Sequence, residues 1–371
     1  MKKIENSSKY DNMKINEIKK DYPGNKRIVY FDALRILASF FIIIIHVSSA
    51  YWEVQNIYSF EWQAMTLFNG ISRWGVPIFV MMSGALFLNR NVSISELYRK
   101  YILRLAVSFV FWSLGYALLY YFFDTEKSLI NFFASIIKGH YHMWFIYMIT
   151  GLYIITPFLA KIVKNERLLM YFLILSFIFA IVIPQICSIV GIINYQYGKF
   201  IETVVNQTHL KFLLGYSFYY VLGYYLSHKK IGMKESIIIY CCGIIGFVST
   251  VFFTETLSMH KGLAIGIFFN NMTVNIAFES LAIYIFVMRL LSNRNINDKT
   301  CLLISSFSKY SFGAYLIHAL IITILDKRFG LTSISFNTYI AVPLISIVVF
   351  IISYAISALL NHVPCIKKYI V

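Results

Sequence analysis

The chain is dominated by long apolar runs that contain very few charged residues. It has 371 residues, of which 59% are hydrophobic and only 13% are charged. A soluble globular chain is typically about 45–50% apolar and about 25% charged. Because about 20 consecutive apolar residues let a helix cross the hydrocarbon core of a bilayer, the runs predict an all-α, multi-pass membrane protein.

About ten of these runs are long enough to be membrane-spanning helices. They cover about 34–51, 67–88, 102–123, 142–160, 168–190, 211–227, 236–254, 263–290, 308–325 and 337–360. The stretch 191–210 is expected to be a polar loop, and 128–137 an interfacial helix. Residues 1–27 are polar and rich in lysine, which predicts a cytoplasmic tail ahead of one membrane domain, 28–371.

The basic residues concentrate in the loops that follow the even-numbered spans. Lys161 and Lys164 follow the fourth span, and Lys229 and Lys230 follow the sixth. The positive-inside rule therefore places both termini in the cytoplasm. The protein is expected to reside in the cell membrane. This topology accounts for the net charge of +16 without a nucleic-acid partner. The five cysteines lack the spacing of a disulfide framework or a metal site, so no metal is expected.

Arg35 and His46 are the first ionisable residues inside a predicted span. They are eleven residues apart, which returns a helix to nearly the same face about 16 Å further along. Asp32 lies one turn before Arg35 and can pair with it. Snorkelling of Arg35 to lipid headgroups and a hydrogen bond from His46 to another span are the simpler interpretations. A shared stripe favours a cavity, in which a histidine can transfer protons near neutral pH.

Further basic residues lie near the ends of the second and third spans. Arg73 is expected to enter the second span from the outer side, where it either snorkels or faces a cavity. The segment SELYRKYILRL places Arg99, Lys100 and Arg104 at the cytoplasmic start of the third span. These three residues are either ordinary positive-inside charges or a rim that binds phosphate.

Two aromatic or histidine-containing segments are candidates for contact with an acceptor substrate. His142 and Trp144 lie at the outer mouth of the fourth span, either in an interfacial aromatic belt or against the substrate. In the ninth span His318 shares a helix face with Ser311 and Tyr315, where interhelical hydrogen bonding is the favoured role and substrate contact the alternative.

The eighth span carries polar residues at every fourth position. Asn271, Asn275 and Glu279 are therefore expected on one helix face. They either hold helices together or line a cavity, and a carboxylic acid is costly enough in a membrane to favour the cavity.

Four segments in order resemble one known family. They are Asp32-x-x-Arg35 with ten residues before His46, Ser72–Arg73 through VPIFVMMSGALF, HMWF, and SFGAYLIHALI. This order resembles the acyltransferase 3 family of membrane O-acyltransferases over roughly residues 28–360. In particular, it is similar to the branch that includes the O-acetyltransferase for enterobacterial common antigen.

The resemblance implies transfer of an acyl group, usually acetyl, from cytoplasmic acetyl-CoA to a hydroxyl of a cell-envelope glycan or lipid-linked saccharide. It implies that His46 is the catalytic histidine and Arg35 its partner, and that Arg73 and Arg104 match conserved basic positions of the family. Many members have Arg-x-x-Arg before the third span, whereas here Arg99 and Lys100 stand five and four residues before Arg104.

Together these patterns assign expected roles. His46 acts as general base or as an acyl-histidine nucleophile, supported by Arg35 and Glu279. The expected contacts with acyl-CoA are Arg35, Arg73, Arg99, Lys100 and Arg104. The expected contacts with the acceptor are His142, Trp144, Asn271, Asn275 and His318, and an oxyanion is expected to meet Arg73, Asn271 or Asn275.

Two other classes of protein fit the composition. A proton-coupled transporter of a small or saccharide substrate would also bury Arg, His and Glu within its spans. A scaffolding membrane protein would explain the topology but not the polar stripe. The acceptor, the acyl group and the oligomeric state are left open by the sequence.

Overall fold

The computed structural model describes residues 29–90, 92–123, 128–207, 215–292 and 296–371, and all regular structure in these ranges is helical. The predicted tail, 1–27, lies outside the described residues. The α-helices are α2 Val29–Ser49, α3 Phe60–Ser72, α4 Gly75–Phe87, α5 Ile94–Glu96, α6 Leu103–Phe123, α7 Leu129–Lys138, α8 Trp144–Ile162, α9 Glu166–Ser176, α10 Ile183–Ile193, α11 Tyr195–Gln207, α13 Ser217–His228, α14 Met233–Lys261, α15 Val274–Ser292, α16 Asp298–Ser308, α17 Ser311–Phe329, α18 Thr338–Leu360 and α19 Pro364–Tyr369. Short 3₁₀ or π segments are η1 Leu97–Ile102, η2 Tyr141–Met143, η3 Phe177–Val182 and η4 Ile267–Phe269.

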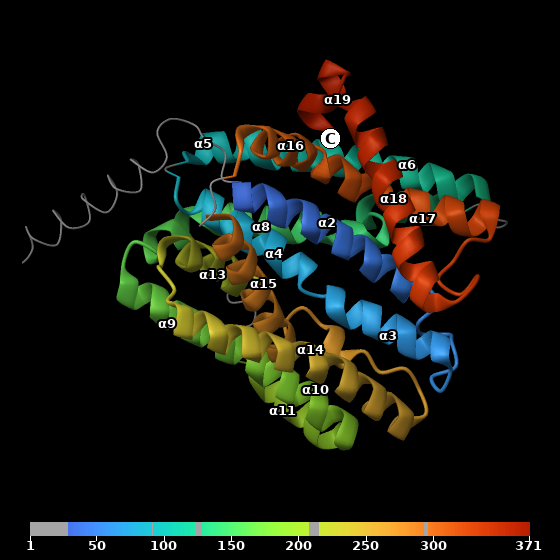
Figure 1. The fold of residues 1–371 in the computed structure, drawn as a ribbon, viewed down its shortest axis with the longest axis horizontal. Helices are drawn as coiled ribbons and strands as arrows, with labels where there is room; N and C mark the ends of the chain where they lie inside the picture. The colour runs from blue at the N-terminus through green and yellow to red at the C-terminus, as the bar shows by residue number, and fades with distance from the viewer. Residues whose placement is uncertain (1–28, 91, 124–127, 208–214, 293–295) are drawn as a thin grey trace, which may run out of the picture.

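Helix α2 is the centre of the bundle. It packs against α3 and α4 on one side and contacts α15, α16, α17 and α18 on others (Figure 1). Most of its side chains are buried, which fits a helix surrounded by other helices rather than by lipid. The ionisable residues of α2 are therefore held inside the protein.

Within the described residues, eight helical segments are long and apolar enough to cross a membrane, or nine if the bent pair α16–α17 is one span. Two predicted spans account for the difference between the eight helical segments and the predicted number of about ten. The sixth corresponds to α13, whose described part has only 12 residues, and residues 208–214 before it are outside the described residues. The ninth corresponds to the α16–α17 pair, which bends by 51°. The number ten and the cytoplasmic termini stay predictions.

The predicted second span is one segment, Phe60–Phe87, interrupted near its middle. Helix α3 ends at Ser72 and α4 begins at Gly75, so Arg73 and Trp74 form the break. Pro77 explains the interruption, because it has no N–H to donate to the carbonyl four residues earlier, that of Arg73. Arg73 thus lies partway along the segment, whereas the sequence placed it near the outer end.

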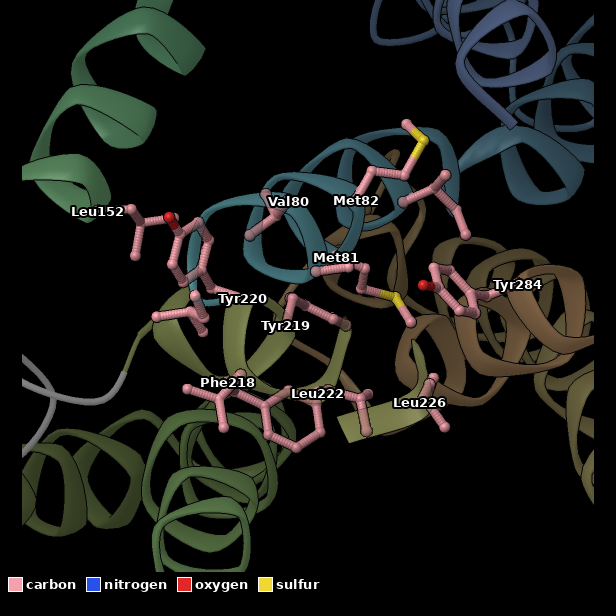
Figure 2. Packing of buried hydrophobic residues seen from close by; sticks show 14 of the residues in the cluster. Val80, Met81, Met82, Leu152, Phe218, Tyr219, Tyr220, Leu222, Leu226 and Tyr284 are labelled. Carbon is pink, nitrogen blue, oxygen red and sulfur yellow. The ribbon is translucent and has the colours of Figure 1, made fainter. Parts of the chain in front are cut away.

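Helices α4 and α13 pack with their backbones in close contact. A Cβ atom added at Gly84 would lie 1.7 Å from the carbonyl oxygen of Tyr220, and one at Gly223 would lie 1.9 Å from that of Met81. Figure 2 shows Met81 beside Tyr219 in the buried cluster between these helices. Small residues that permit such an approach are typical of helix contacts in membranes.

The stretch 191–210, expected to be a polar loop, is largely helical. Helices α10 and α11 form a hairpin, with the turn at Asn194. The side-chain oxygen of Asn194 accepts hydrogen bonds from the backbone N–H groups of Gln196 and Tyr197, which caps α11. Gly198 faces Gly191 so closely that an added Cβ would lie 2.2 Å from its Cα. The cap and this contact favour a helix despite the polar composition. The expected helix at 128–137 is present as α7.

Candidate functional site

A cavity of about 300 Å³ lies beside α2, and half of the predicted site residues line it. It is bordered by α2, the α3–α4 break, the start of α8 and the start of α17. The candidates on its wall are Arg35, His46, Arg73, His142, Trp144, Asn271 and Tyr315. Apolar side chains, including Phe79, Ile149 and Phe312, supply much of the remaining lining. The cavity combines an apolar wall with a few polar groups, as ligand sites usually do.

His46 lies in a cluster of aromatic and histidine rings. Its ring stacks on that of His318 with centroids 5.1 Å apart, and meets Tyr141 edge-on at 5.0 Å. The ring of His142 is 6.5 Å away. Within the described part of the chain no hydrogen bond occupies the ring nitrogens of His46, so they are available to a substrate. The Nε2 atoms of His142 and His318 are buried and also lack a partner among the described residues.

Arg35 is held in place from two helices. Its Nη1 forms a 2.9 Å ion pair with Asp32 and donates a 2.8 Å hydrogen bond to the hydroxyl of Ser308 on α16. Ser305 and Ser308 also donate to the Asp32 carboxylate at 2.9 and 2.7 Å. The Asp32 side chain is 2% exposed and that of Arg35 is 24% exposed. The buried carboxylate therefore fixes the arginine while part of the guanidinium faces the cavity.

Arg73 brings a second cation to the cavity wall. Its Nε donates a 2.6 Å hydrogen bond to Asn69, and its guanidinium lies 4.8 Å from the centroid of the Phe269 ring. Over the described residues no carboxylate lies within 4 Å of this guanidinium. A cation in the protein interior without a paired anion can stabilise negative charge that appears on a bound ligand.

Asn271 and Trp144 form the wall near η4. Asn271 precedes α15, so it does not share the helix face expected for it with Asn275 and Glu279. Its Nδ2 donates a 3.1 Å hydrogen bond to the hydroxyl of Tyr216, while its Oδ1 is buried without a donor among the described residues. Trp144 packs against Tyr216 with centroids 5.7 Å apart.

Asn275 and Glu279 lie on α15 but not on the cavity wall. Thr250 of α14 donates to Oε1 of Glu279 at 2.7 Å and accepts a 2.7 Å hydrogen bond from Asn275. Gln185 of α10 also donates to Asn275, at 3.3 Å. These bonds hold α10, α14 and α15 together. Glu279 also lines a separate pocket of about 370 Å³, and Asn275 one of about 240 Å³. The predicted oxyanion role of Asn275 and catalytic role of Glu279 stay predictions.

Three residues predicted to form a phosphate-binding rim do not line the cavity, and each has different neighbours. They are Arg99, Lys100 and Arg104. Arg99 is exposed, and Lys100 forms an exposed 3.3 Å ion pair with Glu96. Arg104 donates a 2.6 Å hydrogen bond to the main-chain oxygen of Val371, and its guanidinium lies 5.8 Å from the ring centroid of Phe312. His318 is likewise absent from the cavity wall, but its ring contacts those of His46, His142 and Tyr315, which line it.

Some important partners were not identified from the sequence. Ser305 and Ser308, which fix Asp32, are one turn apart on α16, but nothing in the sequence shows that α16 lies against α2. Tyr216 follows the residues outside the described ranges and belongs to a helix that packs deep in the bundle, so its side-chain contacts had no sequence signal. Both cases depend on long-range packing.

Comparison with known proteins gives one match. The family model described as an acyltransferase domain, that of the acyltransferase 3 family, matches residues 28–361, nearly the whole chain. Neither the curated proteins nor the solved structures gave a significant match. The match covers every residue on the cavity wall.

Proposed function

Because the chain belongs to the acyltransferase 3 family and is a membrane acyltransferase, we propose that it transfers acetyl from cytoplasmic acetyl-CoA to a hydroxyl of a cell-envelope glycan or lipid-linked saccharide. The observation that carries this proposal is that Arg35, His46 and Arg73 line the same cavity. A base that shares a cavity with two cations suits a reaction between an anionic donor and a neutral hydroxyl. We also propose the enterobacterial common antigen branch as the nearest functional analogue within the family.

The donor is expected to enter at the Arg35 end of the cavity. A volume of about 300 Å³ suits the thioester and part of its arm, so the nucleotide must lie outside. Guanidinium groups bind phosphate through paired N–H donors. Arg35 therefore binds the donor nearest the cavity, and Arg99, Lys100 and Arg104 are proposed to contact the nucleotide phosphates beyond it.

His46 is proposed as the general base. Its imidazole takes the proton from the acceptor hydroxyl as the hydroxyl oxygen attacks the thioester carbonyl carbon. The carbon–sulfur bond then breaks, and the imidazolium returns the proton to the departing thiolate. The reaction therefore yields an ester and free CoA with no net proton gained or lost. Its ring nitrogens are available for this role because they have no hydrogen-bond partner in the described part of the chain.

Arg73 is proposed to stabilise the oxyanion formed during this attack. It lies on the same cavity as His46 and has no paired carboxylate among the described residues. Loss of a single oxyanion-hole donor typically costs about 100- to 1000-fold in kcat. The Asn271 Oδ1 atom, an acceptor, suits the incoming hydroxyl better than the oxyanion. His142 and Trp144 are proposed to contact the same acceptor.

The proposal is tested with purified protein in proteoliposomes, acetyl-CoA labelled in its acetyl group, and envelope membranes of the source organism as acceptor mixture. Label is expected to appear in alkali-labile esters of the saccharide fraction, with one CoA released for each ester. Replacing acetyl-CoA with succinyl-CoA measures acyl preference. Absence of ester label above protein-free liposomes would refute the proposal.

The family assignment does not favour the alternative of a proton-coupled carrier. The same proteoliposomes distinguish the two, because a carrier would move saccharide across the membrane without releasing CoA. Saccharide flux without release of CoA would support the carrier.

A further inference from the structure

A second cavity of about 600 Å³ lies between the α10–α11 hairpin and residues 267–273. Polar side chains from both sides line it, and the described residues give it amide, cationic and anionic groups together. They include Gln185, Lys199, Glu202, Asn206 and Asn270. Tyr195 and Tyr216 add aromatic surface. Figure 1 shows that α10 and α11 lie on the side of the bundle away from α19.

Only a thin wall separates this cavity from the one that holds His46. Tyr216 lines the second cavity and Asn271 lines the first, and the two are joined by a 3.1 Å hydrogen bond. Asn270, the neighbour of Asn271, lines the second cavity. Trp144 lies on the wall of the first cavity and packs against Tyr216. A ligand in the second cavity is therefore separated from the first cavity by the side chains of Tyr216, Asn271 and Trp144.

The wall holds a buried acceptor that no described residue satisfies. The Oδ1 atom of Asn271 is buried and has no hydrogen-bond donor among the described residues. A buried amide oxygen without a donor costs about 1–3 kcal/mol. A hydroxyl group on a ligand would remove that cost.

The lining of the second cavity fits a saccharide. Sugars present many hydroxyl groups, which both donate and accept, so they match carboxylate, amide and ammonium groups. Lys199 and Glu202 are one helical turn apart, yet neither belongs to an ion pair in the part of the chain that the structure describes. The Nζ atom of Lys199 lies 5.8 Å from the centroid of the Tyr195 ring, which also lines the cavity, so a ligand there meets the cation, the carboxylate and the ring together. By the positive-inside rule, the segment after the fifth predicted span, which contains α11, is expected on the outer side, opposite the proposed entrance for acetyl-CoA.

We infer that the cavity between α10, α11 and residues 267–273 binds the saccharide portion of the acceptor. Its hydroxyl then passes Tyr216 and Asn271 to reach His46. This inference rests on the proposed function, because it names where that reaction holds its second substrate.

The test introduces a large side chain into the second cavity from α10. It compares this variant with one that carries the same new side chain at a position of α10 outside the cavity. Ser188 lines the cavity, whereas Ile186 of the same helix is exposed and is not on its wall. Ser188→Trp and Ile186→Trp are assayed in proteoliposomes with labelled acetyl-CoA and envelope membranes of the source organism. Ser188→Trp is expected to raise the apparent KM for the envelope acceptor at least about tenfold while acetyl-CoA binding is retained. Ile186→Trp is expected to stay within about twofold of wild type.

A second pair of variants keeps the test decisive if Ser188→Trp does not fold. Glu202 lines the cavity and Thr203, its neighbour on α11, does not. Glu202→Ala is expected to raise the acceptor KM about tenfold or more, because hydrogen bonds to charged groups are strong, and Thr203→Ala is not. Equal acceptor KM values within each pair would overturn the inference and leave the proposed function intact. Failure of the wild-type protein to transfer label would instead overturn both.

Discussion

The replacement Asp32→Asn tests how the structure fixes Arg35. Removing one partner of a buried ion pair typically costs about 3–5 kcal/mol. The Arg35 side chain is 24% exposed towards the cavity, so its remaining charge is partly hydrated and the lower end of that range applies. The replacement is therefore expected to lower the free energy of unfolding by about 3 kcal/mol. The new amide N–H groups would also face donors, since Ser305, Ser308 and Arg35 all donate to this carboxylate.

A double-mutant cycle separates the ion pair from the serine hydrogen bonds. In an Arg35→Ala background, Asp32→Asn is expected to cost only about 1 kcal/mol, the value of ordinary hydrogen bonds. Unfolding is followed by reversible denaturant titration in mixed micelles, and the KM for acetyl-CoA is measured on the same samples. Because Asp32 acts through Arg35, Asp32→Asn is expected to raise that KM only when Arg35 is present. An equal cost in both backgrounds, or an unchanged KM, would refute this account.

Two further predictions concern helix packing. Each is compared with a control variant in which the same kind of residue is replaced where the packing contact is absent. Thr250→Val is expected to lower the free energy of unfolding by about 2–3 kcal/mol in the same denaturant titration. The replacement removes the hydroxyl that donates to Glu279 and accepts from the buried amide of Asn275. Thr254→Val, one turn along α14, is expected to be neutral or stabilising, because that hydroxyl is buried with no partner among the described residues. An equal cost for the two replacements would count against the hydrogen-bond network. Gly84→Ala is expected to cost about 3 kcal/mol, because its Cβ would meet backbone 1.7 Å away. As the control, Gly115→Ala places its Cβ in open space and is expected to stabilise α6 by about 0.5–1 kcal/mol. If Gly84→Ala proved as stable as the wild-type protein, that result would contradict the close packing of α4 and α13.

The sequence predicted those features that depend on local pattern. Helical periodicity placed Arg35 and His46 on one stripe of α2, and both line the same cavity. The pairing of Asp32 with Arg35 was also predicted from its spacing, and the 2.9 Å ion pair confirms it. The cost of ionisable groups in lipid identified these residues before any packing was known.

Features that depend on how distant helices meet were not predictable. The roles of Asn271 and Asn275 differ because the helix begins at Val274, so the regular four-residue spacing does not apply to the first of them. Local capping at Asn194 and the contact of Gly191 with Gly198 made a hairpin from residues whose polar composition predicted a loop. By contrast, the hydrogen bonds of Tyr216 with Asn271 and of Ser305 and Ser308 with Asp32 join residues far apart in the chain, which no local pattern predicts.

The most direct test of the central claim is acetyl transfer by His46→Ala, measured with His260→Ala as control. His260 is an exposed histidine near the end of α14, away from the cavity wall. With labelled acetyl-CoA and envelope membranes, His46→Ala is expected to bind acetyl-CoA normally but to transfer at least about 100-fold more slowly, the range for a lost general base. His260→Ala should transfer at the wild-type rate. Wild-type transfer by His46→Ala would contradict the assignment of this cavity as the reaction centre.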